Sequence, residues 1–220
     1  MTHTLGTPHQ SVAVPRSATR ALLTSAMVAG PLFLGAGVVQ GLAREGFRFG
    51  HNAISQLALG DAGWIQTVNF LLAGALLTAG AVGLRASLRR GPGGTWAPVL
   101  VGVFGVSFLA AAAFPADAGA GFPVGAPEAV PAMSAHGAAH MAGGMVGYLA
   151  LCAAFLVLAR PLAARGHRGW ALASRLVPVV VLAGFAGSAV SVLAFTAGAG
   201  LGLLWLTAVT ARLTTDTRTE

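Results

Sequence analysis

Apolar residues fill six long stretches of this chain, and the charged residues stand almost entirely between them. A helix needs roughly 20 apolar residues to cross a hydrocarbon core about 30 Å thick. Each stretch reaches or approaches this length, so the pattern predicts an all-α polytopic membrane protein, a bundle of six transmembrane helices. We expect the spans near residues 21–42, 64–84, 96–114, 136–158, 172–195 and 198–213.

The composition supports a lipid environment. The chain has 220 residues, of which 55% are hydrophobic and 9% are charged, whereas about a quarter of the residues in a soluble domain are charged. The net charge of +7 does not indicate nucleic acid, because the arginines stand singly or in small groups beside the apolar stretches instead of along one basic face. The expected partner is the lipid bilayer, and nucleic acid is not expected.

The arginines also predict how the chain is oriented, because Arg and Lys gather in short cytoplasmic loops. Only two of the 13 basic residues, Arg44 and Arg48, lie on one side of the spans, together with the acidic Glu45, Asp61 and Glu128. We therefore expect both termini in the cytoplasm. The domain organisation is then a flexible cytoplasmic tail over 1–19, a transmembrane domain over 20–213 and a cytoplasmic tail over 214–220.

The connections between the spans give further expectations. The fifth and sixth spans are separated only by Thr196 and Ala197, which predicts a tight turn near Gly198 and Gly200. Residues 118–132 are rich in Pro, Gly and Ala and are interpreted as a low-complexity linker. Small residues let membrane helices approach closely, so the repeated glycines of the spans predict packing within the bundle.

Residues suited to chemistry gather on the side predicted to be extracytoplasmic. His136 and His140 are four residues apart at the start of the fourth span, so they share one helical face. Asp117 follows the end of the third span, and the loop that joins these spans should bring its carboxylate towards the two imidazoles. His51 and Ser55 have the same spacing, and would add an imidazole and a hydroxyl if their segment is helical and folds back.

One hypothesis for this cluster is a zinc-dependent membrane hydrolase that cleaves a lipid or an amide. Three imidazoles and a carboxylate suit zinc, which activates bound water. The metal ligands would be His51, Asp117, His136 and His140, with Ser55 as the catalytic residue that orients water or an oxyanion. Hydrogen bonding at the membrane interface explains the same residues without a metal.

The alternative hypothesis is a non-catalytic accessory, sensor or transport component that binds a lipid or a small molecule at the outer leaflet. Transport is weakly indicated, because no ionisable residue falls in mid-span and no inverted repeat is apparent. A haem carrier is disfavoured because only His167 lies between spans on the cytoplasmic side. The patterns do not decide between an enzyme and a binding protein, and they do not determine the oligomeric state.

A resemblance to a known family rests on three motifs: Phe114-Pro115-Ala116-Asp117, His136-Gly137-Ala138-Ala139-His140 and Ile54-Ser55-Gln56-Leu57. In motifs and in layout over about residues 20–213, the chain resembles a prokaryotic six-span membrane family catalogued as domain of unknown function nine-nine-eight. The resemblance implies a multi-pass protein of the bacterial inner membrane but no reaction. The family often has Glu at the position of Gln56 and Pro at the position of Ala118.

A looser similarity, in ligand types alone, is to the alkaline ceramidase and adiponectin-receptor membrane hydrolases. These proteins combine Ser, Asp and three His around zinc, but their helix count and motif order differ from those of this chain. The similarity therefore suggests a type of chemistry and not a shared fold.

Overall fold

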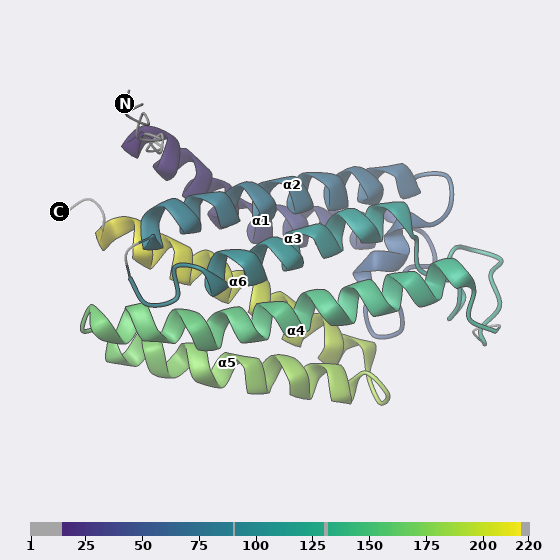
Figure 1. Cartoon of the computed structure of the whole chain (residues 1–220). Helices are drawn as coiled ribbons and strands as arrows, with labels where there is room; N and C mark the ends of the chain where they lie inside the picture. The colour runs from purple at the N-terminus through teal and green to yellow at the C-terminus, as the bar shows by residue number, and fades with distance from the viewer. Residues whose placement is uncertain (1–14, 90, 130–131, 217–220) are drawn as a thin grey trace, which may run out of the picture.

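The computed structural model describes residues 15–89, 91–129 and 132–216. Within them the chain forms six α-helices and one short 3₁₀ helix, η1, with no β-strand (Figure 1). The helices are α1 (Arg16–Ala43), η1 (Ile54–Ala58), α2 (Gly63–Leu88), α3 (Trp96–Ala113), α4 (Ala135–Ala164), α5 (Arg168–Gly187) and α6 (Val192–Asp216).

All six α-helices are long and apolar enough to cross a membrane. Consecutive helices run in opposite directions, so the first residues of α1 and the last residues of α6 lie at the same end of the bundle (Figure 1). These findings confirm the predicted all-α, six-span architecture.

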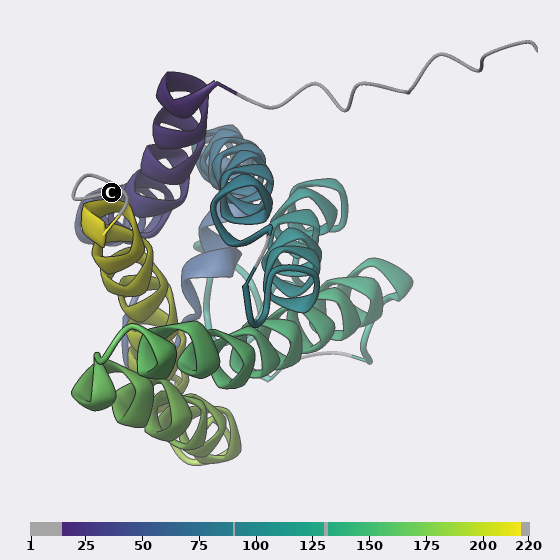
Figure 2. The same ribbon diagram turned by 60° about the vertical axis from the view of Figure 1, so that its left-hand side comes forward.

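The six helices are arranged around a common axis (Figure 2). Each α-helix packs against the next one along the chain, and α6 returns to pack against α1. Glycines permit the close approaches: a Cβ at Gly30 would meet the backbone of Leu203, and a Cβ at Gly147 would collide with the Ser107 hydroxyl. The glycines thus serve packing within the bundle, as predicted.

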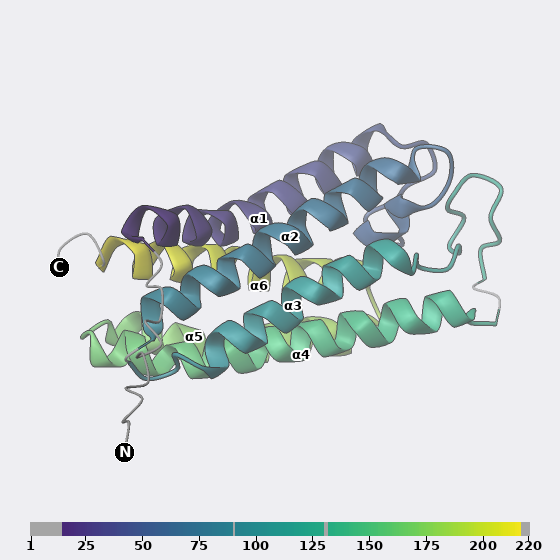
Figure 3. The same cartoon turned by 45° about the horizontal axis from the view of Figure 1, so that its top comes forward.

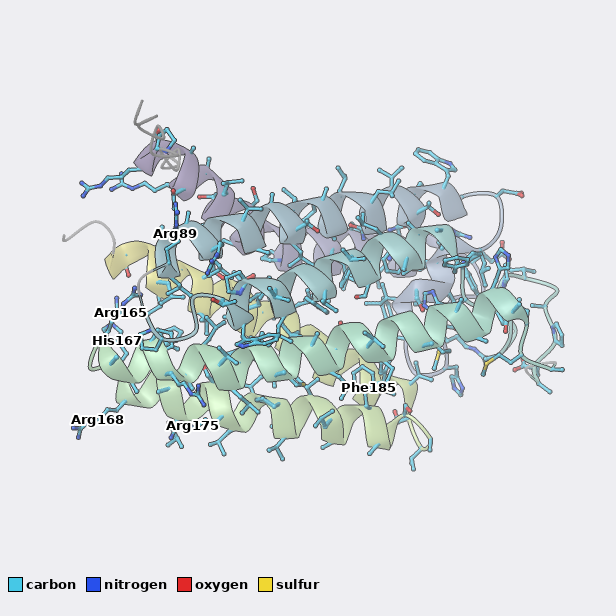
Figure 4. All side chains as sticks on the ribbon, in the orientation of Figure 1. Arg89, Arg165, His167, Arg168, Arg175 and Phe185 are labelled. Atoms are coloured by element: carbon cyan, nitrogen blue, oxygen red, sulfur yellow. The ribbon has the colours of Figure 1, made fainter. Side chains whose placement is uncertain are left out.

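The two ends of the bundle differ in charge. Arg89, Arg165, Arg168 and Arg175 lie at the end where the described chain begins and finishes, which we call the arginine end (Figure 4). The segments 44–62, 114–129 and 132–134 lie at the opposite end, which we call the loop end (Figure 3). In the half of the bundle nearer the arginine end, the interior is filled by fully buried leucines: Leu23, Leu77, Leu84, Leu158, Leu162 and Leu213.

The turn between α5 and α6 is not where the sequence pattern placed it. The helices are joined by residues 188–191, and the predicted turn at Thr196 and Ala197 is wrong because both residues lie inside α6. Gly198 was interpreted as a turn signal, but the structure uses it for helix packing. A Cβ on Gly198 would lie 3.1 Å from the Cα of Gly184 on α5, so the glycine pair allows the two helices to cross closely.

The interpretation of residues 118–132 as a low-complexity linker is also wrong for the part of it that the structure describes. Phe122 is only 1% exposed and packs edge to face against Phe47. The side-chain amide of Asn52, which is completely buried, donates to the carbonyl of Ala120. The Arg44 guanidinium lies over the Phe122 ring. The two loops therefore interlock into one cap over the loop end.

The expected terminal tails can be compared with the structure only in part. Residues 1–14 and 217–220 lie outside the described residues. The described part shows that α1 begins at Arg16, before the expected end of the tail at residue 19, and that α6 continues to Asp216.

Candidate functional site

Asp117 joins the end of α3 to the start of α4. Its carboxylate accepts hydrogen bonds from the Ser134 amide, at 2.9 Å, and from the Ser134 hydroxyl. The Ser134 hydroxyl in turn accepts from the amide of Gly137 at 2.9 Å, so Ser134 is the N-cap of α4. A carboxylate beside the positive end of a helix dipole is favourable. Asp117 thus anchors the N-terminus of α4.

Gly137 makes this anchor possible. A Cβ at position 137 would collide with the Asp117 carboxylate, so only glycine leaves room for it. Hydrogen bonds from the Ser134 hydroxyl and then from its amide hold the pKa of the Asp117 carboxyl below its usual value, and the nearby His136 and His140 act in the same direction. Asp117 thus contacts Ser134 and Gly137 at the end of α4 that carries His136 and His140, the end to which the sequence assigned it.

His140 is held by the backbone of α3. Its Nδ1 lies 2.9 Å from the carbonyl oxygen of Phe114. Since a carbonyl oxygen only accepts, Nδ1 carries the hydrogen and Nε2 is left as an acceptor in the neutral ring. The imidazole ring of His140 also packs edge to face against the Phe70 ring of α2, with 6.2 Å between the ring centroids. His136, one turn earlier, packs against Phe114 instead.

Ser55 lies in η1, which folds back onto the bundle as the sequence suggested. Its neighbours Ile54 and Leu57 are buried in the core, and the Ile54 side chain fills the space that a Cβ on Gly37 would occupy. Gln56 ties η1 to the other loop by donating to the carbonyls of Asp117 and Gly119. His51 precedes η1 in an exposed turn.

The proposed zinc ligands do not form a ligand set in this arrangement. Among the described residues, no group of three or more His, Cys, Asp or Glu side chains is placed so that it could hold a metal ion. The carboxylate of Asp117 is occupied by Ser134. The metal site of His51, Asp117, His136 and His140, with Ser55 as its catalytic residue, stays a prediction without geometric support.

A cavity of about 330 Å³ lies between the helices in the half of the bundle nearer the loop end. All six α-helices and η1 contribute to its wall, which is mainly apolar. Aromatic rings form much of the wall: Phe33, Phe70, Phe108, Tyr148, Phe185 and Phe195. Phe185 extends from α5 towards α4 (Figure 4), where its ring centroid is 5.1 Å from that of Tyr148.

Polar groups are few in this cavity. Its wall includes the side chains of His140 and Ser55, the hydroxyl-bearing Ser188 and Thr196, and Tyr148, whose hydroxyl donates to the Ala199 carbonyl at 3.5 Å. A cavity of this size with apolar walls and a few polar groups is typical of sites for small apolar molecules.

A second, smaller cavity of about 200 Å³ lies beside the first. Ala53, Ser55 and Met141 line both cavities, so the two share a wall. Asp117 and Gln56 line the smaller one. Ser55 and Met141 therefore stand between the larger, apolar cavity and the smaller cavity that Asp117 lines.

Sequence reasoning found His140, Ser55 and Asp117 but missed most of the cavity. Tyr148, Phe185 and Thr196 come from three different helices, and no local pattern marks them as neighbours. One signal was available: Tyr148 is the only tyrosine of the chain and falls within an apolar span, where its hydroxyl needs a partner.

Comparison with known proteins agrees with this architecture. The model of the family described as "Protein of unknown function (DUF998)" matches residues 27–212. The chain therefore belongs to this family, as its motifs suggested. No curated protein and no solved structure was found to match the chain, so the looser similarity to the alkaline ceramidases gains no support.

Proposed function

We propose that this membrane protein binds a single apolar or lipid-like molecule in the cavity between its helices and acts as a binding component, not as a hydrolase. The observation that carries the proposal is the cavity of about 330 Å³ with aromatic walls. A space of this kind suits an alkyl chain or a compact apolar molecule, which gains free energy by leaving contact with water.

The polar residues favour binding over catalysis. A metal-dependent hydrolase needs a ligand set around one ion, and none is assembled among the described side chains. A serine hydrolase needs a hydrogen bond between the serine hydroxyl and the histidine that acts as its base. Among the described residues no hydrogen bond joins Ser55 to His140, which bonds to the Phe114 carbonyl. The nearby Asp117 is engaged with Ser134.

We also propose that the arginine end faces the cytoplasm of a bacterial cell, which puts the cavity in the outer leaflet. The support is the uneven charge: nine described arginines flank the arginine end, whereas Arg44 and Arg48 at the loop end stand among acidic residues. A fluorescent protein that matures only in the cytoplasm, fused to the C-terminus, should be bright. A dark fusion would reverse the orientation and place the cavity in the inner leaflet.

A substitution that fills the cavity tests binding directly. Gly144 lines the cavity, and a Cβ built on it has no atom within 4 Å. Gly144→Leu should therefore extend into the cavity without disturbing the helices. Gly35→Leu is the matched control, because Gly35 also has open space around its Cβ but lies on the exposed face of α1.

The measurement uses a long-chain alcohol with a photoreactive diazirine in its chain, added to the protein in phosphatidylcholine nanodiscs. We expect crosslinks at cavity residues such as Met141, Met145 and Phe185. Gly144→Leu should reduce this labelling by about tenfold, as expected for overpacking by 1–3 kcal/mol, and Gly35→Leu should not. Labelling confined to the outer surface of the helices, or equal labelling of both variants, would disprove the proposal.

A further inference from the structure

Two polar groups near the loop end of the cavity, His140 and Asp117, can accept hydrogen bonds. His140 donates its Nδ1 hydrogen to the Phe114 carbonyl, which leaves Nε2 able only to accept in the neutral ring. Within the described part of the chain, no hydrogen-bond partner is found at Nε2. A molecule in the cavity therefore meets an acceptor at His140.

Asp117 supplies the second acceptor. Ser134 occupies one hydrogen-bonding position on each carboxylate oxygen, so each oxygen can accept another hydrogen bond. Those same hydrogen bonds from Ser134 keep the pKa of Asp117 low, so the group is ionised at neutral pH. With His140 and Tyr148 it is one of three titratable side chains that line the two cavities, and it is the one carboxylate among them.

The arginines of the loop end do not neutralise this site. The Arg44 guanidinium donates to the carbonyls of Leu57 and Leu59, and Arg48 pairs with Glu128. Neither arginine lines the two cavities. Neither arginine pairs with Asp117, whose negative charge on the far side of Ser55 and Met141 is balanced instead by the Ser134 hydrogen bonds, the start of α4 and the nearby imidazoles.

We infer that the bound molecule is amphipathic, with an alkyl body between the helices and a hydrogen-bond-donating head group, a hydroxyl or an ammonium, facing His140, Asp117 and Ser55. The inference rests on the proposed function and adds the class of ligand. A carboxylate or phosphate head offers the site no hydrogen to donate and is repelled by Asp117. The Ser55 hydroxyl both donates and accepts, so it fits either donor head.

A series of head groups on one chain tests the inference. Dodecanol, dodecylammonium and dodecanoate compete with the photoreactive alcohol for the wild-type protein in phosphatidylcholine nanodiscs at neutral pH, with each concentration corrected for partition into the lipid. Dodecanol and dodecylammonium should displace the probe from Met141 and Phe185. Dodecanoate should bind about tenfold or more weakly than dodecanol, because one unfavourable contact between like charges in a partly dry site lowers the affinity by that factor.

Two matched variants separate charge from hydrogen bonding. Asp117→Asn keeps one oxygen that can accept from Ser134 but removes the charge, so the affinity for dodecylammonium should fall about threefold to tenfold further than the affinity for dodecanol. Asp61→Asn, at an exposed position outside both cavities, should change neither. The ratio of the dodecanol affinity to the dodecylammonium affinity is compared within one variant, so it does not depend on what fraction of that variant is folded.

The outcomes distinguish the two proposals. If dodecanoate displaces the cavity label as well as dodecanol does, or if the three head groups are equivalent, the head-group inference is overturned while binding in the cavity stands. If the probe does not label cavity residues at all, the proposed function fails, and this inference fails with it.

Discussion

The two halves of this bundle are built from the same six helices but packed in different ways. Near the arginine end, completely buried leucines and close glycine contacts fill the interior, as at Gly80, where a Cβ would collide with Ala26. Near the loop end the same helices surround a cavity of about 330 Å³, whose wall also includes Ile54 and Ser55 of η1. The difference indicates that the arginine half holds the helices together, whereas the loop half leaves space between them.

The largest expected effect comes from filling space in the packed half. Gly80→Leu forces a side chain against the Ala26 Cβ and backbone, so it should lower the free energy of unfolding by about 3 kcal/mol. Gly144→Leu, the same change in the hollow half, should alter it by less than about 1 kcal/mol. Unfolding by SDS titration from native micelles measures both. Equal losses would mean that the two halves are packed alike.

A moderate effect is expected from the polar contacts between α1 and α2. The buried Gln66 accepts hydrogen bonds from Gln40, at 2.8 Å, and from Asn69, at 3.1 Å. Gln66→Leu should cost about 1 kcal/mol, because the side-chain amides of Gln40 and Asn69 each lose one of their two acceptors in an apolar setting. The double variant with Gln40→Leu should cost less than the sum of the single variants. Strict additivity in a double-mutant cycle would contradict the contact.

The anchor of α4 should give the protein a weak acid dependence. The folded-state pKa of Asp117 is below its usual value of 3.8, so its contribution is complete above the unfolded pKa and is lost as pH falls through the lower folded value. The thermal midpoint of the wild type should therefore decline in this acid range. Asp117→Asn should decline less, and Asp61→Asn should follow the wild type. If the thermal midpoint of Asp117→Asn falls with acid as much as that of the wild type, Asp117 does not anchor α4.

The smallest effect is expected at the surface of the loop cap. The Arg48–Glu128 ion pair is 3.3 Å long, and its side chains are 48% and 78% exposed, so water and salt screen it. Glu128→Gln should change the free energy of unfolding by less than about 0.5 kcal/mol in SDS titration. A larger loss would show that the cap depends on this pair and not on the burial of Phe122.

The sequence predicted the helices well because the signal for each one is local. Twenty apolar residues in succession require a membrane or a large core, whatever the rest of the chain does. The neighbourhood of Asp117 with His136 and His140 was also predictable, because one loop joins the helix ends that carry them. The charge asymmetry was equally visible, although the orientation in the membrane that it indicates stays a prediction.

The errors have a common cause. Glycine is common both in turns and where two helices pack closely, and the sequence around it does not distinguish the two. Gly198 belongs to the second kind because Gly184 of the neighbouring helix lies against it. The order in residues 118–129 depends on Phe47, Asn52 and Arg48, which lie about 70 residues earlier along the chain and give no local signal.

By itself, then, the sequence determined that the protein lies in a lipid bilayer, the number of its spans, its family and the end that carries Asp117, His136 and His140. These properties follow from composition and from short motifs. Only the tertiary structure decided that Asp117 caps a helix, that His140 presents Nε2 as an acceptor, and that Phe185 and Tyr148 face a common cavity. The physical reason is that a cavity is space left between side chains of many helices, and no single segment encodes it.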